Sequence, residues 1–204
     1  MPAIRLTLWI AVAVALFVLG VLSVTGLPSG RGGLAGSGTE RAAGAPLGGD
    51  FNLVNHRGEP VSQAIFRGKP SVTLFGFTQC PDVCPTGLLQ MPLWAEELGD
   101  DADKLRFIFV TVDPERDTIE VMNDYATAFS ERIVGVTGAP DDVHATVKDY
   151  KIYSRKVPLD GGDYTMDHTA SMILHDADGN FVGTIDNAES SETGLAKLKR
   201  LVAG

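Results

Sequence analysis

The amino-acid sequence predicts an α/β sandwich tethered to a membrane, and three observations carry this prediction. A long apolar segment without charge lies near the N-terminus, a stretch rich in Gly, Ala and Ser follows it, and the remaining residues alternate between strand-like and helix-like patterns. The 204 residues are 44% hydrophobic, which suffices for one ordinary domain with attachments. The net charge of −9 argues against a nucleic-acid-binding protein, because phosphate recognition needs a basic face.

The apolar segment covers residues 6–24 and contains no charged residue. At the helical rise its length is about 28 Å, close to the roughly 30 Å of bilayer hydrocarbon. Arg5 and the terminal amine precede it, which favours a cytoplasmic N-terminus. A cleaved signal peptide is the alternative, but no A-x-A site follows before Gly30. We therefore expect residues 1–27 to form a single N-terminal transmembrane helix. The segment lacks the Arg- and Ser-rich character of a mitochondrial transit peptide, so we expect a bacterial inner membrane with the C-terminal domain in the periplasm.

Residues 28–49 are expected to form a flexible Gly/Ala/Ser-rich linker, because such a composition cannot bury a core. The folded domain is then expected over residues 50–204. It carries 14 basic and 25 acidic residues, so its own net charge is 14 − 25 = −11.

The first half of the domain alternates strands with helices. Residues 71–77 and 105–112 are largely apolar runs of strand length, as expected for buried strands. Residues 85–98 have a helical pattern, in which Pro92 is a potential kink. Residues 118–130 also have a helical pattern, with Asp117 placed as the N-cap and an acidic residue at capping-box spacing.

The second half continues the alternation and ends in a hairpin. Residues 132–138 are expected to form a third strand, followed by a helix from Pro140 to about Tyr150. Residues 171–186 carry a β-hairpin signal around an Asp-Gly-Asn turn, and residues 191–202 read as a last helix. This element order is that of a thioredoxin-like domain.

The chemically distinctive motif follows the first buried strand and places Cys80 and Cys84 at a strand-to-helix turn. The positive end of the helix dipole should lower the thiol pKa there and favour thiolate. The i, i+4 spacing places both sulfurs on one face of a helical turn. Such a pair can act as a redox dithiol, chelate a soft metal or form a structural disulfide, and the spacing does not choose among these.

A copper(I) site with two thiolates needs a third ligand, for which four histidines are available. His168 precedes the hairpin, in a loop expected to pass over the cysteine turn, and Asp167 could orient its imidazole. His56 is expected to be exposed and inert, and His144 to lie on a helix surface. His175 is expected to end a strand beside Asp176 and to belong to the hairpin turn.

A third motif, Asp113-Pro114-Glu115-Arg116-Asp117-Thr118, follows the second buried strand. It can be interpreted as a strand-end turn, in which Pro114 stops the ladder, Asp117 caps the next helix and Arg116 pairs with a carboxylate. Alternatively, Asp113 and Arg116 lie near the cysteine turn and tune its charge or dock a partner.

These motifs together resemble the Sco/SenC family of copper-binding assembly proteins. The resemblance rests on residues 76–86 with the two cysteines, on residues 112–118 (VDPERDT), and on Tyr164-x-x-Asp167-His168, and it covers residues 48 to about 186. It implies a thioredoxin-like fold, a single membrane anchor, an exported domain, and copper delivery to the binuclear copper centre of cytochrome c oxidase.

The resemblance also implies that the copper ligands are Cys80, Cys84 and His168. Two thiolates and an imidazole suit copper(I) better than zinc, which would ask for a fourth ligand, and copper(II) could take the same donors. The favoured function is a copper metallochaperone rather than an enzyme, with the copper-site subunit of cytochrome c oxidase as partner and other copper chaperones as further candidates. The alternatives are a thiol:disulfide oxidoreductase that reduces the cysteines of the oxidase copper site, and an envelope redox or copper sensor.

Overall fold

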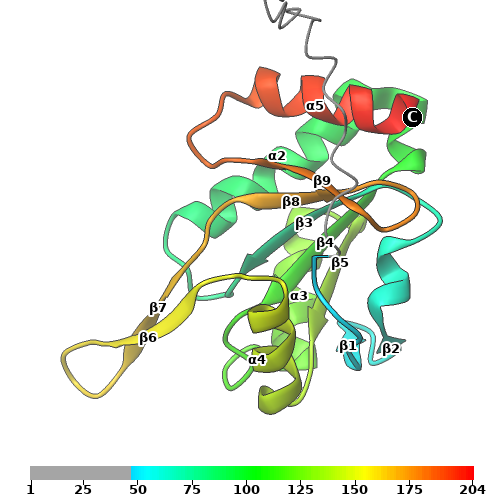
Figure 1. Cartoon of the computed structure of the whole chain (residues 1–204). Helices are drawn as coiled ribbons and strands as arrows, with labels where there is room; N and C mark the ends of the chain where they lie inside the picture. Colours follow the sequence, from blue (N-terminus) through cyan, green and yellow to red (C-terminus); the bar gives the residue numbers. More distant parts are fainter. Residues whose placement is uncertain (1–46) are drawn as a thin grey trace, which may run out of the picture. The chain divides into compact units, whose positions relative to one another are not determined.

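The computed structural model describes residues 47–204 (Figure 1). The transmembrane helix expected within residues 1–27 and most of the expected linker lie outside this range. Within residues 47–204, no helix is both long enough and apolar enough to cross a membrane.

A seven-stranded sheet forms the centre of the domain, with strand order β2-β1-β5-β4-β3-β8-β9. Strands β3, β4 and β5 run parallel, whereas β1 and β8 pair antiparallel with β5 and β3. Strand β3 is buried along its whole length, as expected for a strand covered on both faces. The bounds of the seven strands are β1 Leu53–Asn55, β2 Pro60–Val61, β3 Ser71–Gly76, β4 Arg106–Thr111, β5 Ile133–Thr137, β8 Met172–His175 and β9 Phe181–Ile185.

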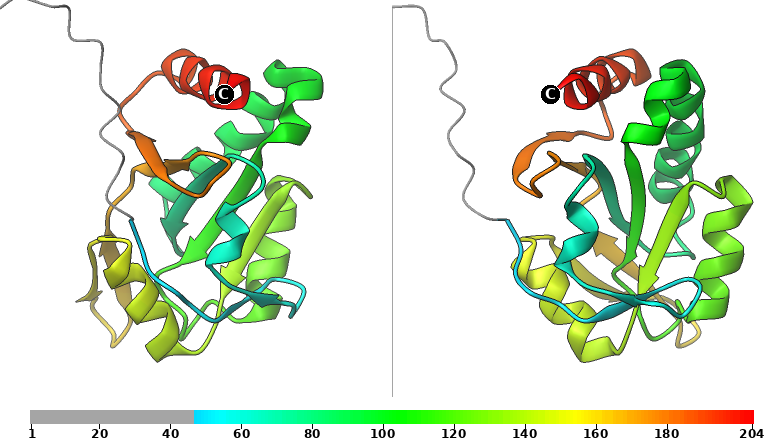
Figure 2. Two further views of the ribbon diagram at one scale, coloured as in Figure 1. Left: turned by 45° about the vertical axis from the view of Figure 1, so that its right-hand side comes forward. Right: turned by 90° about the vertical axis from the view of Figure 1, so that its right-hand side faces the viewer.

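Four α-helices cover the two faces of this sheet, so the predicted α/β sandwich is confirmed (Figure 2). Their bounds are α2 Val83–Leu98, α3 Ile119–Phe129, α4 Pro140–Asp149 and α5 Ser191–Ala203, and short 3₁₀ turns occupy Gln63–Phe66 and Gly99–Lys104. Alternating side chains of the strands belong to two hydrophobic cores. Leu74 and Phe109 pack with α2, α3 and α5, whereas Phe75 and Ile108 pack with α4.

The predicted helices and central strands are all present, but the helix starting near residue 118 begins differently from the prediction. Its N-cap is Thr118, whose hydroxyl accepts the backbone N–H of Val121 at 3.3 Å. The prediction that Asp117 is the cap is therefore wrong. Asp117 is instead fully buried and bonds to neighbouring strands.

A second, two-stranded sheet was not predicted and consists of β6 (Ser154–Pro158) and β7 (Tyr164–His168). The two antiparallel strands project as a hairpin from the main body of the domain (Figure 1). His168, expected in a loop, is the last residue of β7 and pairs in register with Ser154. The hairpin therefore delivers this histidine to the domain from a strand end.

Candidate metal centre

Both cysteines lie at the carboxyl end of β3, where the chain turns into α2. Cys80 precedes the helix by three residues, and Cys84 is its second residue. Their exposed fractions are 8% and 0%, and both are free thiols. The backbone N–H of Cys84 donates to Sγ of Cys80 at 3.5 Å, so the helix start holds the two sulfurs on the same side.

His168 completes a cluster with the two thiols. Its Nε2 lies 3.4 Å from Sγ of Cys84, and the ligand atoms of all three residues lie within 4.8 Å of one another. The Nδ1 atom lies 2.9 Å from the carbonyl oxygen of Thr169. A carbonyl oxygen only accepts, so Nδ1 carries the proton of the neutral ring, and the lone pair of Nε2 faces the sulfurs. The ring of Phe77 meets the imidazole edge-on, at 5.6 Å between centroids.

Asp167 does not orient the imidazole, contrary to the prediction. Its carboxylate lies 3.6 Å from the guanidinium of Arg155, and both side chains are more than half exposed. Successive residues of a strand point to opposite faces, so Asp167 turns to solvent when His168 turns inward. The Thr169 carbonyl takes the orienting role.

The pKa values of the two thiols are shifted in opposite directions. The hydrogen bond from Cys84 holds the pKa of Cys80 far below its ordinary value; burial opposes this shift, and the bond to His168 adds to it. The same bond, together with burial, raises the pKa of Cys84. The sequence thus predicted the direction of the pKa shift of Cys80, although the main cause of the shift is the neighbouring thiol rather than the helix dipole.

Burial lowers the pKa of His168, but its bonds to the Cys80 thiolate and the Thr169 carbonyl outweigh burial, and the net pKa is raised. The site therefore holds one thiolate ready, while Cys84 must lose its proton before both sulfurs can bind a cation.

Two residues that the sequence analysis did not assign to the metal site, Gly76 and Asp117, determine how the cysteine turn packs. Gly76 ends β3, and a Cβ atom there would lie 2.5 Å from Sγ of Cys84 and 2.8 Å from the ring of Phe109. Asp117 accepts hydrogen bonds from the backbone and hydroxyl of Thr78 at 3.2 and 2.6 Å, and from the hydroxyl of Thr111 at 2.5 Å. It thereby fastens the cysteine turn to the end of β4.

Another group, here called the hairpin anchor (Asp113, Arg116 and Tyr164), holds the β6–β7 hairpin against the cysteine turn. Arg116 forms an ion pair with the buried carboxylate of Asp113 and donates to the carbonyl of Tyr164 at 2.8 Å. The hydroxyl of Tyr164 donates to Asp113 at 2.7 Å, and the guanidinium stacks 3.8 Å above the Tyr164 ring. Arg116 also donates to Gln79 at 3.0 Å. The motif is thus a strand-end turn in which Arg116 pairs with a carboxylate, as predicted, and it lies beside the cysteine turn. The predicted cap role of Asp117 is wrong, and tuning of the site's charge or docking of a partner by Asp113 and Arg116 stays a prediction.

The other three histidines lie outside the cluster. His144 is exposed on α4, as predicted. The prediction that His56 is exposed is wrong, because it is buried and its Nδ1 accepts the backbone N–H of Gly135 at 2.9 Å. His175 ends a strand, as predicted, because it is the last residue of β8, and it is buried against the ring of Phe66.

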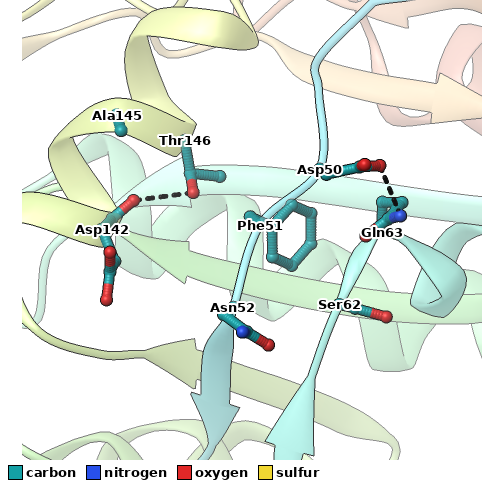
Figure 3. A pocket seen from close by; sticks show the side chains of 8 residues that line it. All are labelled: Asp50, Phe51, Asn52, Ser62, Gln63, Asp142, Ala145 and Thr146. Carbon is teal, nitrogen blue, oxygen red and sulfur yellow. Dashed lines mark hydrogen bonds between the residues drawn. The ribbon is translucent and has the colours of Figure 1, made fainter.

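Figure 3 shows a cavity of about 450 Å³ that contains neither cysteine nor histidine. Its polar groups are largely bonded to their own neighbours: Gln63 donates to Asp50 at 2.5 Å, and Thr146 donates to the carbonyl of Asp142 at 2.8 Å. This cavity therefore offers no thiol or imidazole ligand for a metal.

Fold and site together define a class: a thioredoxin-like α/β domain with two thiols and an imidazole gathered where a buried strand meets a helix. The model of the SCO1/SenC family matches residues 39–203, and the chain belongs to this family. A further solved structure with this fold, 23% identical and with a TM-score of 0.59, is that of BsSco, a member of the Sco family of cytochrome c oxidase assembly proteins.

Solved and curated relatives agree with this assignment. The structure of Bradyrhizobium japonicum ScoI with copper bound is 42% identical, has a TM-score of 0.71, and is matched over 76% of this chain and 99% of that one. Yeast Sco1 with copper bound is 34% identical, with a TM-score of 0.72, covering 78% of this chain and 90% of that one. The mitochondrial SCO2 protein of Saccharomyces cerevisiae is 36% identical over 160 residues, which are 76% of this chain and 53% of that protein. The chain thus spans about half the length of this curated relative.

Proposed function

We propose that the protein is a copper metallochaperone, which holds copper through Cys80, Cys84 and His168 and delivers it to the copper-site subunit of cytochrome c oxidase. The observation that carries this proposal is the convergence of two sulfurs and one imidazole nitrogen within 4.8 Å. Copper-bound structures of relatives such as Bradyrhizobium japonicum ScoI support the choice of metal. Membership in a family of oxidase assembly proteins supports the choice of recipient.

The donor set fits copper(I). Two thiolates and an imidazole are soft or borderline ligands, which suit a cation that accepts low coordination. Structural zinc takes four ligands, and the cluster found among the described residues offers three. Both cysteines are buried, and a copper(I) ion would reduce the charge of the two thiolates from −2 to −1, which lowers the cost of keeping both deprotonated there.

Uptake and release follow from the way in which the three ligands are held. Cys80 supplies the first thiolate, Cys84 binds after losing its proton, and His168 closes the site through Nε2. On release, thiolates of the recipient displace His168 first, because it is a neutral ligand on a projecting hairpin. The two sulfurs then hand over the cation by ligand exchange.

The proposed setting is the bacterial envelope. Residues 1–27 would anchor the chain once in the inner membrane, residues 28–49 would form the linker, and residues 50–204 would work on the periplasmic side. The uncharged run of residues 6–24 supports the anchor, because its length as a helix matches the hydrocarbon core.

A second candidate is a thiol:disulfide oxidoreductase acting on the cysteines of the oxidase copper site. It is favoured by the lowered pKa of Cys80, because thiolate is the attacking form in thiol–disulfide exchange. This candidate needs both cysteines but not His168.

Anaerobic titration with copper(I) against a chromophoric chelator separates the two functions. We expect one copper per chain, bound about tenfold or more weaker in His168→Ala, which corresponds to about 1.4 kcal/mol. His144→Ala is the matched control, because this exposed histidine lies on α4 and outside the cluster. Equal affinity in all three proteins would refute the ligand role of His168 and favour the oxidoreductase, whose reduction potential would then be measured.

A further inference from the structure

A groove of about 810 Å³ lies beside the hairpin that carries His168, between the end of α4 and strand β6. Its charged lining is mainly basic, with Lys148, Lys151, Arg155 and Lys156 against one carboxylate, Glu115, and it is here called the basic groove. These are four of the 14 basic residues in a domain of net charge −11. The groove is thus a local concentration of positive charge on an acidic protein.

Part of this charge is available to a ligand. Lys156 is paired with Glu115 at 2.8 Å, and Arg155 lies 3.6 Å from an exposed aspartate. Lys148 and Lys151 are exposed and form no ion pair with any residue that the structure describes. Two cations therefore face the groove without a counter-charge.

The backbone of Lys151 gives an independent indication. Its φ is +57°, and it is the only residue other than glycine with positive φ in the described part of the chain. Lys151 follows the last turn of α4, where the N–H of Ile152 bonds to the carbonyl of Val147 at 3.0 Å. Glycine is the usual residue at this helix end, because a side chain disfavours the left-handed conformation. A lysine at this position is consistent with a role for its charge.

The shape of the groove favours a protein segment as its occupant. Ile152 and Met166, each 8% exposed, contribute apolar surface, and Tyr153, 52% exposed, lies at the rim. A concave surface with apolar and basic parts suits a chain segment that carries carboxylates together with apolar side chains.

The groove is directly connected to the candidate metal centre. Ser154 lines the groove and is the cross-strand neighbour of His168. Tyr153 also lines it, and its backbone N–H and carbonyl both bond to Thr169, at 3.1 and 3.0 Å. An occupant of the groove would therefore touch the strand that pairs with the histidine.

We infer that the basic groove docks an acidic segment of the protein that exchanges metal with this site. The identity of that protein as the metal-exchange partner rests on the proposed function, whereas binding of an acidic segment does not. Attraction between the groove and carboxylates would steer the partner toward the hairpin and raise the association rate at low ionic strength.

The test uses the metal-free full-length protein in a non-ionic detergent and a fluorescein-labelled hexaglutamate peptide, with binding followed by anisotropy at low salt. We expect the double variant Lys148→Glu/Lys151→Glu to bind about tenfold or more weaker than the unaltered protein. The matched control is Lys199→Glu/Arg200→Glu, which changes the net charge equally on α5, at the opposite end of the domain from α4 (Figures 1 and 2). The control should retain most of the binding. Equal losses in both doubles, or no binding by the unaltered protein, would overturn the proposal.

Two further measurements test the role of Lys151 and the kind of ligand that the groove binds. Lys151→Gly should raise the thermal midpoint, because glycine accepts positive φ, and should still weaken peptide binding, because one cation is lost. A higher midpoint with unchanged binding would contradict the role of this lysine.

Glycerol 1-phosphate, a lipid headgroup mimic, should displace the labelled peptide less effectively than unlabelled hexaglutamate does. The reverse order would assign the groove to phosphate headgroups. Because no metal is used, these results do not depend on copper binding.

Discussion

The two parts of the candidate metal centre are built differently. Cys80 and Cys84 follow β3, whose six residues are all buried, whereas His168 ends a hairpin in which one of ten strand residues is buried. Two ligands are thus fixed by the core of the domain, and the third is brought to them by a peripheral hairpin. The difference indicates a site in which the thiols hold the cation while the histidine controls its retention.

The contacts that secure each part follow the same division. The cysteine turn is tied to β4 through the buried Asp117, and it leaves no room for a side chain at Gly76. The hairpin depends on the polar hairpin anchor, in which the buried Asp113 holds the partly exposed Arg116 and Tyr164. Variants of the first part should therefore affect folding and binding together, and variants of the second should affect binding with little effect on folding.

The largest effect on stability is expected for Asp117→Ala. It leaves the backbone and hydroxyl of Thr78 and the hydroxyl of Thr111 without their acceptor, which should lower the free energy of unfolding by about 4 kcal/mol. In a domain of this size the thermal midpoint should fall by about 10 °C. Asp163→Ala is the control, because this carboxylate is 67% exposed and its bonds, to Arg116 at 3.4 Å and to the adjacent backbone N–H of Tyr164 at 2.8 Å, are made at the surface. Similar thermal midpoints for the two variants would contradict the view that the cysteine turn contributes more to stability than the hairpin does.

A smaller effect is expected from acidification, to which His175 of the core strand β8 and His168 of the hairpin contribute with opposite signs. Burial lowers the pKa of His175 from 6.5 to about 4, so the folded protein keeps this ring neutral where the unfolded chain protonates it. The unfolded chain then binds more protons, and stability should fall by up to about 3 kcal/mol as the pH drops from about 6.5 to about 4. The raised pKa of His168 acts in the opposite direction: its contribution is present at low pH and is lost as the pH rises through the folded pKa.

Urea unfolding of the metal-free protein at a series of pH values measures these slopes. His175→Gln should flatten the fall of stability below about pH 6.5, and His168→Gln should flatten the loss of stability above about pH 6.5. His144→Gln replaces an exposed side chain and is the control for both slopes. If His175→Gln kept the full slope, the buried carboxylates rather than this ring would control acid sensitivity.

The same division decides what the sequence could predict. Residues 71–77 and 105–112 are largely apolar runs, which is the sequence pattern of buried parallel strands. The positions of β3, β4 and the cysteine turn were therefore predicted closely. Strand β6 reads Ser-Arg-Lys-Val-Pro, and an exposed hairpin held by polar anchors has no apolar periodicity to detect.

Asp117 was misassigned for a related reason. An acidic residue just before a helix is the usual signal of an N-cap, and a buried acceptor at the same position has the same sequence pattern. The difference lies in Thr78 and Thr111, which are distant in sequence and become its partners only when β3 and β4 pair.

The smallest effect on stability, and the sharpest test of the comparison, is expected for Tyr164→Phe. The variant removes the hydroxyl that donates to Asp113 but keeps the ring under Arg116, so the free energy of unfolding should fall by about 1 kcal/mol. Because the hairpin then holds His168 less firmly, copper(I) should pass to a small thiol acceptor severalfold faster than from the unaltered protein. Tyr153→Phe is the matched control, since its ring is 52% exposed and its interactions with Thr169 are made by the backbone. Unchanged transfer in Tyr164→Phe, or a stability loss as large as that of Asp117→Ala, would show that hairpin and core act as one unit and that the histidine is not separately released.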